Sequence, residues 1–76
     1  MDRLEIYKEV EAERLNQIRQ HGSDNDEHNI PNDWLAHIIK HLGRAWTKPF
    51  DRLMFRQQMI RVAALAVAAV GWVDKR

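Results

Sequence analysis

The chain is predicted to fold as one all-α domain, a three-helix antiparallel protomer that spans residues 1–76. Apolar residues recur at helical spacing in three long segments, and no segment alternates in the way a strand does. Two clusters of turn formers and helix breakers separate these segments. A chain of 76 residues has room for one domain at most.

The first helix is predicted to run from about residue 2 to residue 20. Asp2 is a suitable N-cap, because its carboxylate can accept hydrogen bonds from the free N–H groups of the first turn. At about 100° per residue, one face is apolar and carries Leu4, Tyr7, Val10, Leu15 and Ile18. The other side is acidic, with Glu5, Glu9 and Glu13. The helix is expected to stop at His21-Gly22, where glycine supplies the left-handed turn.

The second helix is predicted over about residues 33–46, after a joint at residues 23–31 that consists almost entirely of turn formers and breakers. Asn32 or Asp33 is expected to cap it. Its apolar face repeats at helical spacing and comprises Trp34, Leu35, Ile38, Ile39, Leu42 and Ala45. The opposite side is a basic stripe of His37, Lys40, His41 and Arg44.

The third helix is predicted over about residues 49–74. Thr47-Lys48-Pro49 forms the joint before it, with Pro49 at the first helical position, which favours proline. One face of this helix carries Met54, Gln58, Arg61, Leu65, Ala68 and Trp72. Gln58 and Arg61 therefore interrupt a stripe that is otherwise apolar.

The small size of the domain predicts that it forms a homodimer. A chain this short buries only about 60% of the surface that its unfolded chain exposes, and without cysteine it cannot form a disulfide. Oligomerisation is the remaining common source of stability. The uncharged, alanine-rich run of the third helix is expected to supply the interface, and its predicted core or interface residues are Val62, Leu65, Val70 and Trp72.

The composition favours a cytoplasmic protein with no membrane partner. The longest apolar run, residues 62–73, is shorter than the roughly 20 residues that span a bilayer. Residues 1–5 lack the apolar stretch of a signal peptide. The absence of cysteine suits a reducing compartment.

The order and spacing of four segments resemble a known family. These are residues 9–14 with Gln17, the His21-Gly22 turn, residues 32–34, and the tail from Arg56 through the alanine-rich run to Trp72. Together they are similar to the all-α nucleoside triphosphate pyrophosphohydrolases, the MazG-like proteins common in phages and prophages. The resemblance implies a shortened, MazG-like helical fold and a phage or prophage type of protein.

The chain departs from this family at the residues that hold its magnesium. The family carries Glu-Glu-x-x-Glu on one helix and Glu-x-x-Asp on the next, whereas the matching positions here read Lys40, His41 and Arg44, then Gln58 and Arg61. Carboxylates that attract divalent cations are thus replaced by two arginines, a lysine, a histidine and a glutamine, none of which is an anionic ligand. We therefore expect no bound metal, no cofactor and no catalytic residue.

A non-catalytic binding protein is the function that this departure favours. Lys40, Arg44 and Arg61 could converge on an anion, since arginine suits bidentate contacts with phosphate or carboxylate. The expected partner is a host or phage protein or a phosphorylated small molecule, with His41 and Gln58 as further contact residues. The alternative reading of the basic stripe is a solvated face of an amphipathic helix.

Other functions remain open from the sequence. One is an active pyrophosphohydrolase with rebuilt ligands, of which Glu9 and Glu13 are candidates. Another is a weak nucleic-acid binder, for which only Trp46, between Arg44 and Lys48, has a suitable setting, and the net charge of +1 argues against it. Two metal patterns fall short: His37 and His41 have ligand spacing but cationic neighbours, and the acidic segment 24–28 lacks the calcium-loop spacing.

Overall fold

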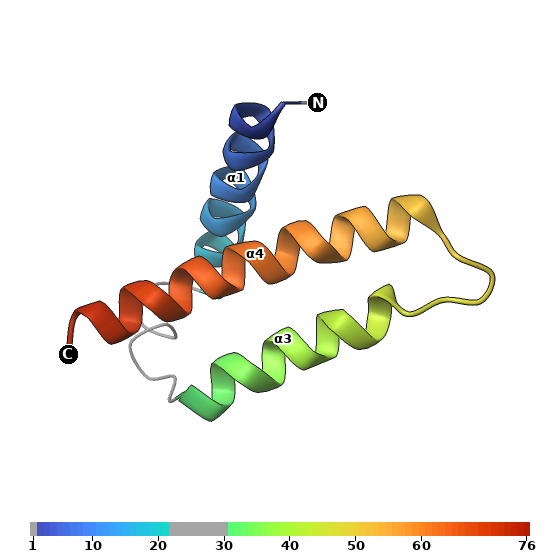
Figure 1. Ribbon diagram of the computed structural model, residues 1–76. Helices are drawn as coiled ribbons and strands as arrows, with labels where there is room; N and C mark the ends of the chain where they lie inside the picture. Colours follow the sequence, from blue (N-terminus) through green and yellow to red (C-terminus); the bar gives the residue numbers. More distant parts are fainter. Residues whose placement is uncertain (1, 22–30) are drawn as a thin grey trace.

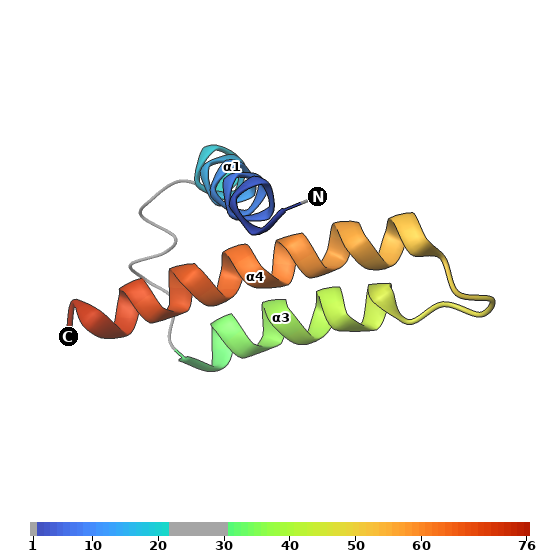
Figure 2. The same cartoon turned by 45° about the horizontal axis from the view of Figure 1, so that its top comes forward.

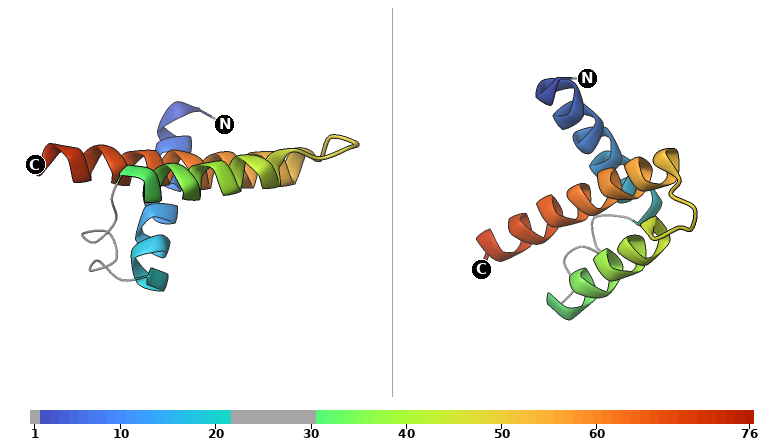
Figure 3. Two further views of the ribbon diagram at one scale, coloured as in Figure 1. Left: turned by 90° about the horizontal axis from the view of Figure 1, so that it is seen from below. Right: turned by 45° about the vertical axis from the view of Figure 1, so that its right-hand side comes forward.

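Three helices make up the computed structural model, which describes residues 2–21 and 31–76. They are α1 (Arg3–His21), α3 (Pro31–Ala45) and α4 (Arg52–Asp74) (Figure 1). No strand occurs in the described residues, so the all-helical prediction is confirmed. Helices α3 and α4 lie side by side as an antiparallel hairpin (Figure 2). Helix α1 crosses α4 steeply (Figure 3) and does not contact α3 within the described ranges.

The cap predicted for α1 is confirmed. Asp2 Oδ1 accepts a hydrogen bond from the backbone N–H of Glu5 at 2.9 Å, and the carbonyl of Asp2 accepts one from the N–H of Ile6. These bonds satisfy donors that the first turn of a helix leaves without partners. The glycine expected to end this helix lies outside the described residues.

The predicted start of α3 was wrong by two residues. Helix α3 begins at Pro31, so Asn32 and Asp33 lie inside its first turn and are not its cap. Proline suits the first helical position, because its φ is fixed at a helical value and its missing N–H would have no helical partner there. The helix ends at Ala45, one residue before the predicted end.

The predicted start of α4 was also wrong, because an aspartate overrides the proline signal. Asp51 has an extended backbone and its Oδ1 accepts a hydrogen bond from the N–H of Met54 at 3.0 Å. The N–H of Asp51 in turn donates to Thr47 Oγ1 at 3.0 Å. This side-chain cap sets the first helical residue at Arg52, and Pro49 lies in the connection before it.

The core is small and centres on α4, which packs against both other helices. Its buried apolar residues, among those described, are Trp34, Ala45, Ala64 and Leu65. The face predicted for α4 is confirmed as the side packed against other helices: Gln58 and Leu65 are buried, and Met54, Arg61, Ala68 and Trp72 are half-buried. Many large apolar side chains remain exposed, so the protomer leaves much of its apolar surface outside this core.

The apolar face predicted for α1 was wrong in part. Leu4, Tyr7 and Leu15 are 70%, 60% and 54% exposed. The half-buried side of α1 instead includes Glu9, Glu13 and the amide of Gln17. Glu9 and Gln17 have hydrogen-bond partners on α4, namely the side chain of Arg56 and the carbonyl of Arg61.

Helix α4 as a whole is long and apolar enough to cross a membrane, although its longest uncharged run is shorter than a bilayer requires. Core helices of soluble proteins share this length and composition. The helix carries Arg52, Arg56 and Arg61 in its N-terminal half. Charges at such positions are costly within a bilayer.

Shortening Leu65 to alanine should destabilise the fold by about 2–3 kcal/mol, because it leaves a cavity in a core that has few members. Chemical denaturation followed by circular dichroism measures this change. Val67→Ala, two residues along the same helix but 56% exposed, is the control and should change stability by less than about 0.5 kcal/mol. Equal effects of the two substitutions would contradict the placement of the core.

Candidate functional site

A hydrogen bond between α3 and α4 lies at the centre of the candidate site. His41 Nδ1 is 2.6 Å from Gln58 Oε1, so the imidazole donates and the amide oxygen accepts. Gln58 is only 2% exposed, and its Nε2 donates to the sulfur of Met54 at 3.5 Å. A buried amide requires such partners, because leaving it without them costs about 1–3 kcal/mol.

Three cations surround His41. Lys40 and Arg44 come from α3, one residue before and three residues after it, and Arg61 approaches from α4. Burial is the main cause that lowers the pKa of His41 below its ordinary value of 6.5, and repulsion by Arg44, Arg61 and Lys40 lowers it further. The hydrogen bond that the imidazole donates to Gln58 raises the pKa and so acts in the opposite direction. His41 is therefore held as neutral imidazole among positive charges.

We call Lys40, His41, Arg44 and Arg61 the basic cluster, with Gln58 beneath it. His41 points toward α4 and contacts Gln58, and Lys40, Arg44 and Arg61 are near enough to act on its charge. From the sequence, two possibilities were open for the basic stripe: convergence with Arg61, or a solvated face of α3. His37, the fourth member of that stripe, stays exposed on α3. The five candidate residues taken from the sequence thus lie in one region of the structure.

Helix α1 is joined to α4 beside this cluster. Gln17 Nε2 donates to the backbone carbonyl of Arg61 at 3.3 Å. The other side-chain atom of this amide, Gln17 Oε1, is buried and has no partner among the described residues. Because a buried acceptor without a partner is costly, this oxygen is a point of local strain next to the site.

The donor atoms of the cluster suit an anion better than a metal ion. Magnesium takes hard oxygen ligands, and the cluster offers ammonium and guanidinium groups and one imidazole. In the part of the chain that the structure describes, no three His, Asp or Glu side chains gather closely enough to share a metal ion. His37 and His41 have ligand spacing, but His41 is directed toward Gln58. The acidic segment 24–28 lies outside the described residues.

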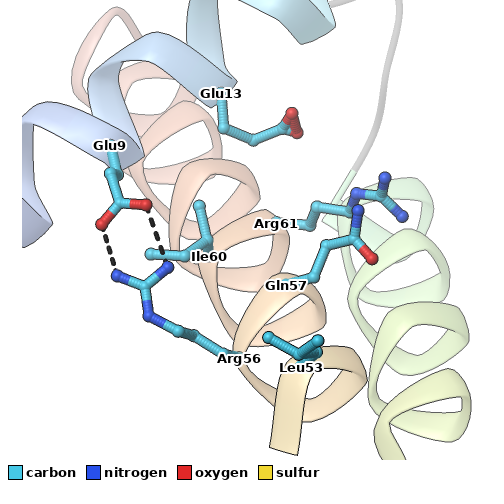
Figure 4. A pocket seen from close by; sticks show the side chains of 7 residues that line it. All are labelled: Glu9, Glu13, Leu53, Arg56, Gln57, Ile60 and Arg61. Atoms are coloured by element: carbon cyan, nitrogen blue, oxygen red, sulfur yellow. Dashed lines mark hydrogen bonds and ion pairs between the residues drawn. The ribbon is translucent and has the colours of Figure 1, made fainter.

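A groove of about 410 Å³ lies between α1 and α4 (Figure 4). Both oxygens of the Glu9 carboxylate accept hydrogen bonds from the guanidinium of Arg56, one of them at 2.9 Å. This hydrogen bond lowers the pKa of the Glu9 carboxyl and raises the pKa of Arg56. The other residues that line the groove are Glu13, Leu53, Gln57, Ile60 and Arg61.

The groove was not predicted from the sequence, apart from the suggestion that Glu9 and Glu13 could be metal ligands. The geometry opposes that suggestion, because Arg56 occupies both oxygens of Glu9. Glu13 Oε1 accepts a hydrogen bond from Asn16 at 3.1 Å. Glu9 and Arg56 are 47 residues apart, so no periodicity within a helix could have paired them.

The residues proposed from the sequence for core or interface take different positions. Leu65 is in the protomer core, and Val70 is 60% exposed. Val62 and Trp72 are half-buried, and Trp72 Nε1 is buried without a partner in the described region. The guanidinium of Arg76 lies 4.4 Å from the centre of the Trp72 ring, a cation–π contact.

Comparison of the chain with models of protein families, with curated proteins and with solved structures finds no match. The similarity to MazG-like proteins therefore rests on the sequence motifs alone.

Acid is expected to destabilise the fold through His41. Because the pKa of His41 is below 6.5 in the folded protein, the unfolded chain takes up this proton first as the pH falls. The contribution of His41 to the free energy of unfolding is fully present above the pKa that His41 has in the unfolded chain. It is lost as the pH falls toward the lower pKa that His41 has in the folded protein. Thermal unfolding between about pH 7.5 and 5 should therefore show a smaller loss of Tm for His41→Gln than for the wild type.

His37→Gln, a change of the same kind on the exposed side of α3, is the control and should behave like the wild type. If His41→Gln retains the full pH dependence, His41 is not the group that titrates.

Proposed function

We propose that this protein is a non-catalytic helical binding protein whose basic cluster receives an anionic group. The group is a phosphate of a small molecule, or a carboxylate or phosphate of a host or phage protein. The observation that carries this proposal is the hydrogen bond between His41 and Gln58. It brings the cations of α3 next to Arg61 of α4, so that one anion can contact both helices.

The chemistry of the cluster supports an anion as its ligand. Arginine binds carboxylate and phosphate oxygens in bidentate fashion, and lysine adds a flexible point charge. While Nδ1 of His41 donates to Gln58, its Nε2 carries no proton. An anion placed among these groups favours the protonated imidazole, so Nε2–H becomes a further donor when the anion arrives.

The resemblance to MazG-like proteins supports the same proposal. At the family's metal-ligand positions this chain has Lys40, His41, Arg44, Gln58 and Arg61, which suit the charge of a triphosphate without the metal that would activate water. We place the protein in the cytoplasm as a homodimer of phage or prophage type, since its core is small and it has no cysteine.

Two other functions compete with this proposal. A pyrophosphohydrolase with rebuilt ligands would need Glu9, which Arg56 already engages through both oxygens. A weak nucleic-acid binder is favoured by one observation, because Trp46 is 77% exposed between Arg44 and Lys48 and could stack on a base. A salt-dependent mobility shift with single-stranded RNA or DNA would identify a nucleic-acid binder.

The purified protein should not hydrolyse any common nucleoside triphosphate in the presence of magnesium or manganese. The reason is that cations occupy the positions from which carboxylates would hold the metal. Release of pyrophosphate or phosphate is the measurement. Turnover above background that a chelator abolishes would contradict the proposal.

Charge reversal at Arg44 should weaken binding of inorganic triphosphate by about 1 kcal/mol, roughly fivefold, because Arg44 is exposed and its contacts are screened by water. Calorimetric titration at low salt is the measurement for Arg44→Glu. Fold stability should change little, since the side chain is outside the core.

Glu5→Arg reverses a charge on the exposed side of α1 and is the control. If Arg44→Glu and Glu5→Arg leave the affinity equally unchanged, the basic stripe is only a solvated helix face.

A further inference from the structure

One side of the α3–α4 hairpin is bare. Figure 1 looks onto this side: α1 stands above α4, and its C-terminal end passes behind α4. The N-terminal end of α1 projects to the front side beyond the edge of α4 (Figure 3), but no described helix covers α3 or α4 from the front. We call this side the front face. Its chemistry decides what could cover it.

Helix α3 contributes an exposed apolar stripe to the front face. Its members are Leu35, Ile39 and Leu42, which are 55%, 64% and 46% exposed, together with Trp46, which directly follows the helix and is 77% exposed. Each directly follows a residue packed toward α4, namely Trp34, Ile38, His41 and Ala45. Since one residue advances a helix by about 100°, the stripe lies a quarter turn from the contact with α4.

Helix α4 contributes a matching stripe. Phe55 and Val73 are 43% and 58% exposed, and they directly follow Met54 and Trp72 on the packed face. Val70, 60% exposed, lies between them in the chain. In each helix, the residue that follows a contact residue lies about a quarter turn further around the axis. Because the two right-handed helices are antiparallel, these following residues lie on the same side of the pair. The two stripes therefore form one continuous surface.

This surface has the size and composition of an interface. Helix α3 alone, with 15 residues, is about 22 Å long, and two packed helices are about 20 Å wide. The flat area of about 450 Å² is the same order as the ~800 Å² of accessible surface that each partner of a stable complex buries. Apart from Arg52 at the first turn of α4, helical spacing puts no charged residue on this face.

We propose that the front face is covered by the front face of a second copy, related to the first by a two-fold axis. This inference rests on the proposed homodimer and adds the surface through which it forms. Two antiparallel helix pairs facing each other would make a four-helix arrangement with a shared apolar interior. Leu65 stays in the core of its own protomer, and the stripes on both helices, not the alanine-rich helix alone, make the interface.

A second copy fits the front face better than a lipid surface does. Helices that lie on membranes carry lysine and arginine beside the apolar face, where they meet acidic headgroups. Here Lys40 and Arg44 lie on the far side of α3 from Leu35 and Ile39, by the same helical spacing. Pairing through the front face leaves both basic clusters directed outward, one on each side of the dimer.

Sedimentation equilibrium of the full chain, from about 1 to 100 µM, tests this inference with two matched variants. Leu35→Asp places a charge on the front face, and Leu15→Asp places the same charge on α1, where the leucine is equally exposed at 54%. Leu35→Asp should raise the dissociation constant of the dimer at least tenfold, whereas Leu15→Asp should leave it within twofold. Ile39→Asp is the second front-face variant and should act like Leu35→Asp, with helicity by circular dichroism showing that each variant is folded.

The possible outcomes distinguish the proposed homodimer from the proposed interface. A wild-type protein that is monomeric throughout overturns both the homodimer and its surface. A dimer that Leu35→Asp and Ile39→Asp do not weaken overturns the front face but leaves the homodimer. A monomer that co-sediments with phosphatidylcholine or phosphatidylserine vesicles, and loses this binding in Leu35→Asp, assigns the face to lipid. None of these results alters the triphosphate titration of the basic cluster.

Discussion

Gln58 is the one polar side chain that is buried among the described residues, and the oxygen of its amide has the imidazole of His41 as its partner. An apolar stripe tolerates such a group only where the facing helix supplies a partner. The contact therefore fixes how α3 is set along and around α4. A shift of α3 by one residue would rotate it by about 100° and separate the pair.

The orientation of α3 against α4 divides the surface of α3 into three strips. One strip, with Trp34 and Ala45, is buried against α4, and a second, with Lys40 and Arg44, carries the positive charge. The third is the front face. Because α4 also supports α1, it has packed neighbours on two sides and its third side bare. Core, charged cluster and front face thus follow from the placement of one helix pair.

Much of this could be predicted from the sequence, and the failures have physical causes. Helical periodicity located the three helices and the packed face of α4. His41 and Gln58, two of the candidate residues taken from the sequence, are hydrogen-bonded to each other. Periodicity could not divide the apolar side of α3 into a buried strip and an exposed one, since both are apolar. Periodicity also favoured Leu4 and Leu15 for the packed face of α1, although both are exposed. It considers only the spacing of apolar residues, and so it could not show that Arg56 of α4 is a partner for Glu9. The cap at Asp51 was missed because Pro49 gave a competing signal for the same helix start.

The way α1 is attached gives the two parts of the molecule different responses to salt. Helix α1 is joined to α4 by an ion pair at the surface and by the bond from Gln17 to the carbonyl of Arg61, and its apolar residues Ile6, Val10 and Ile18 are half-buried. Surface ion pairs are screened as ionic strength rises, whereas the apolar contacts between α3 and α4 are not. We therefore expect rising ionic strength to weaken the attachment of α1 more than it weakens the hairpin. If α1 detaches, it uncovers the flank of α4 next to Arg61, so ionic strength would change how accessible that flank is.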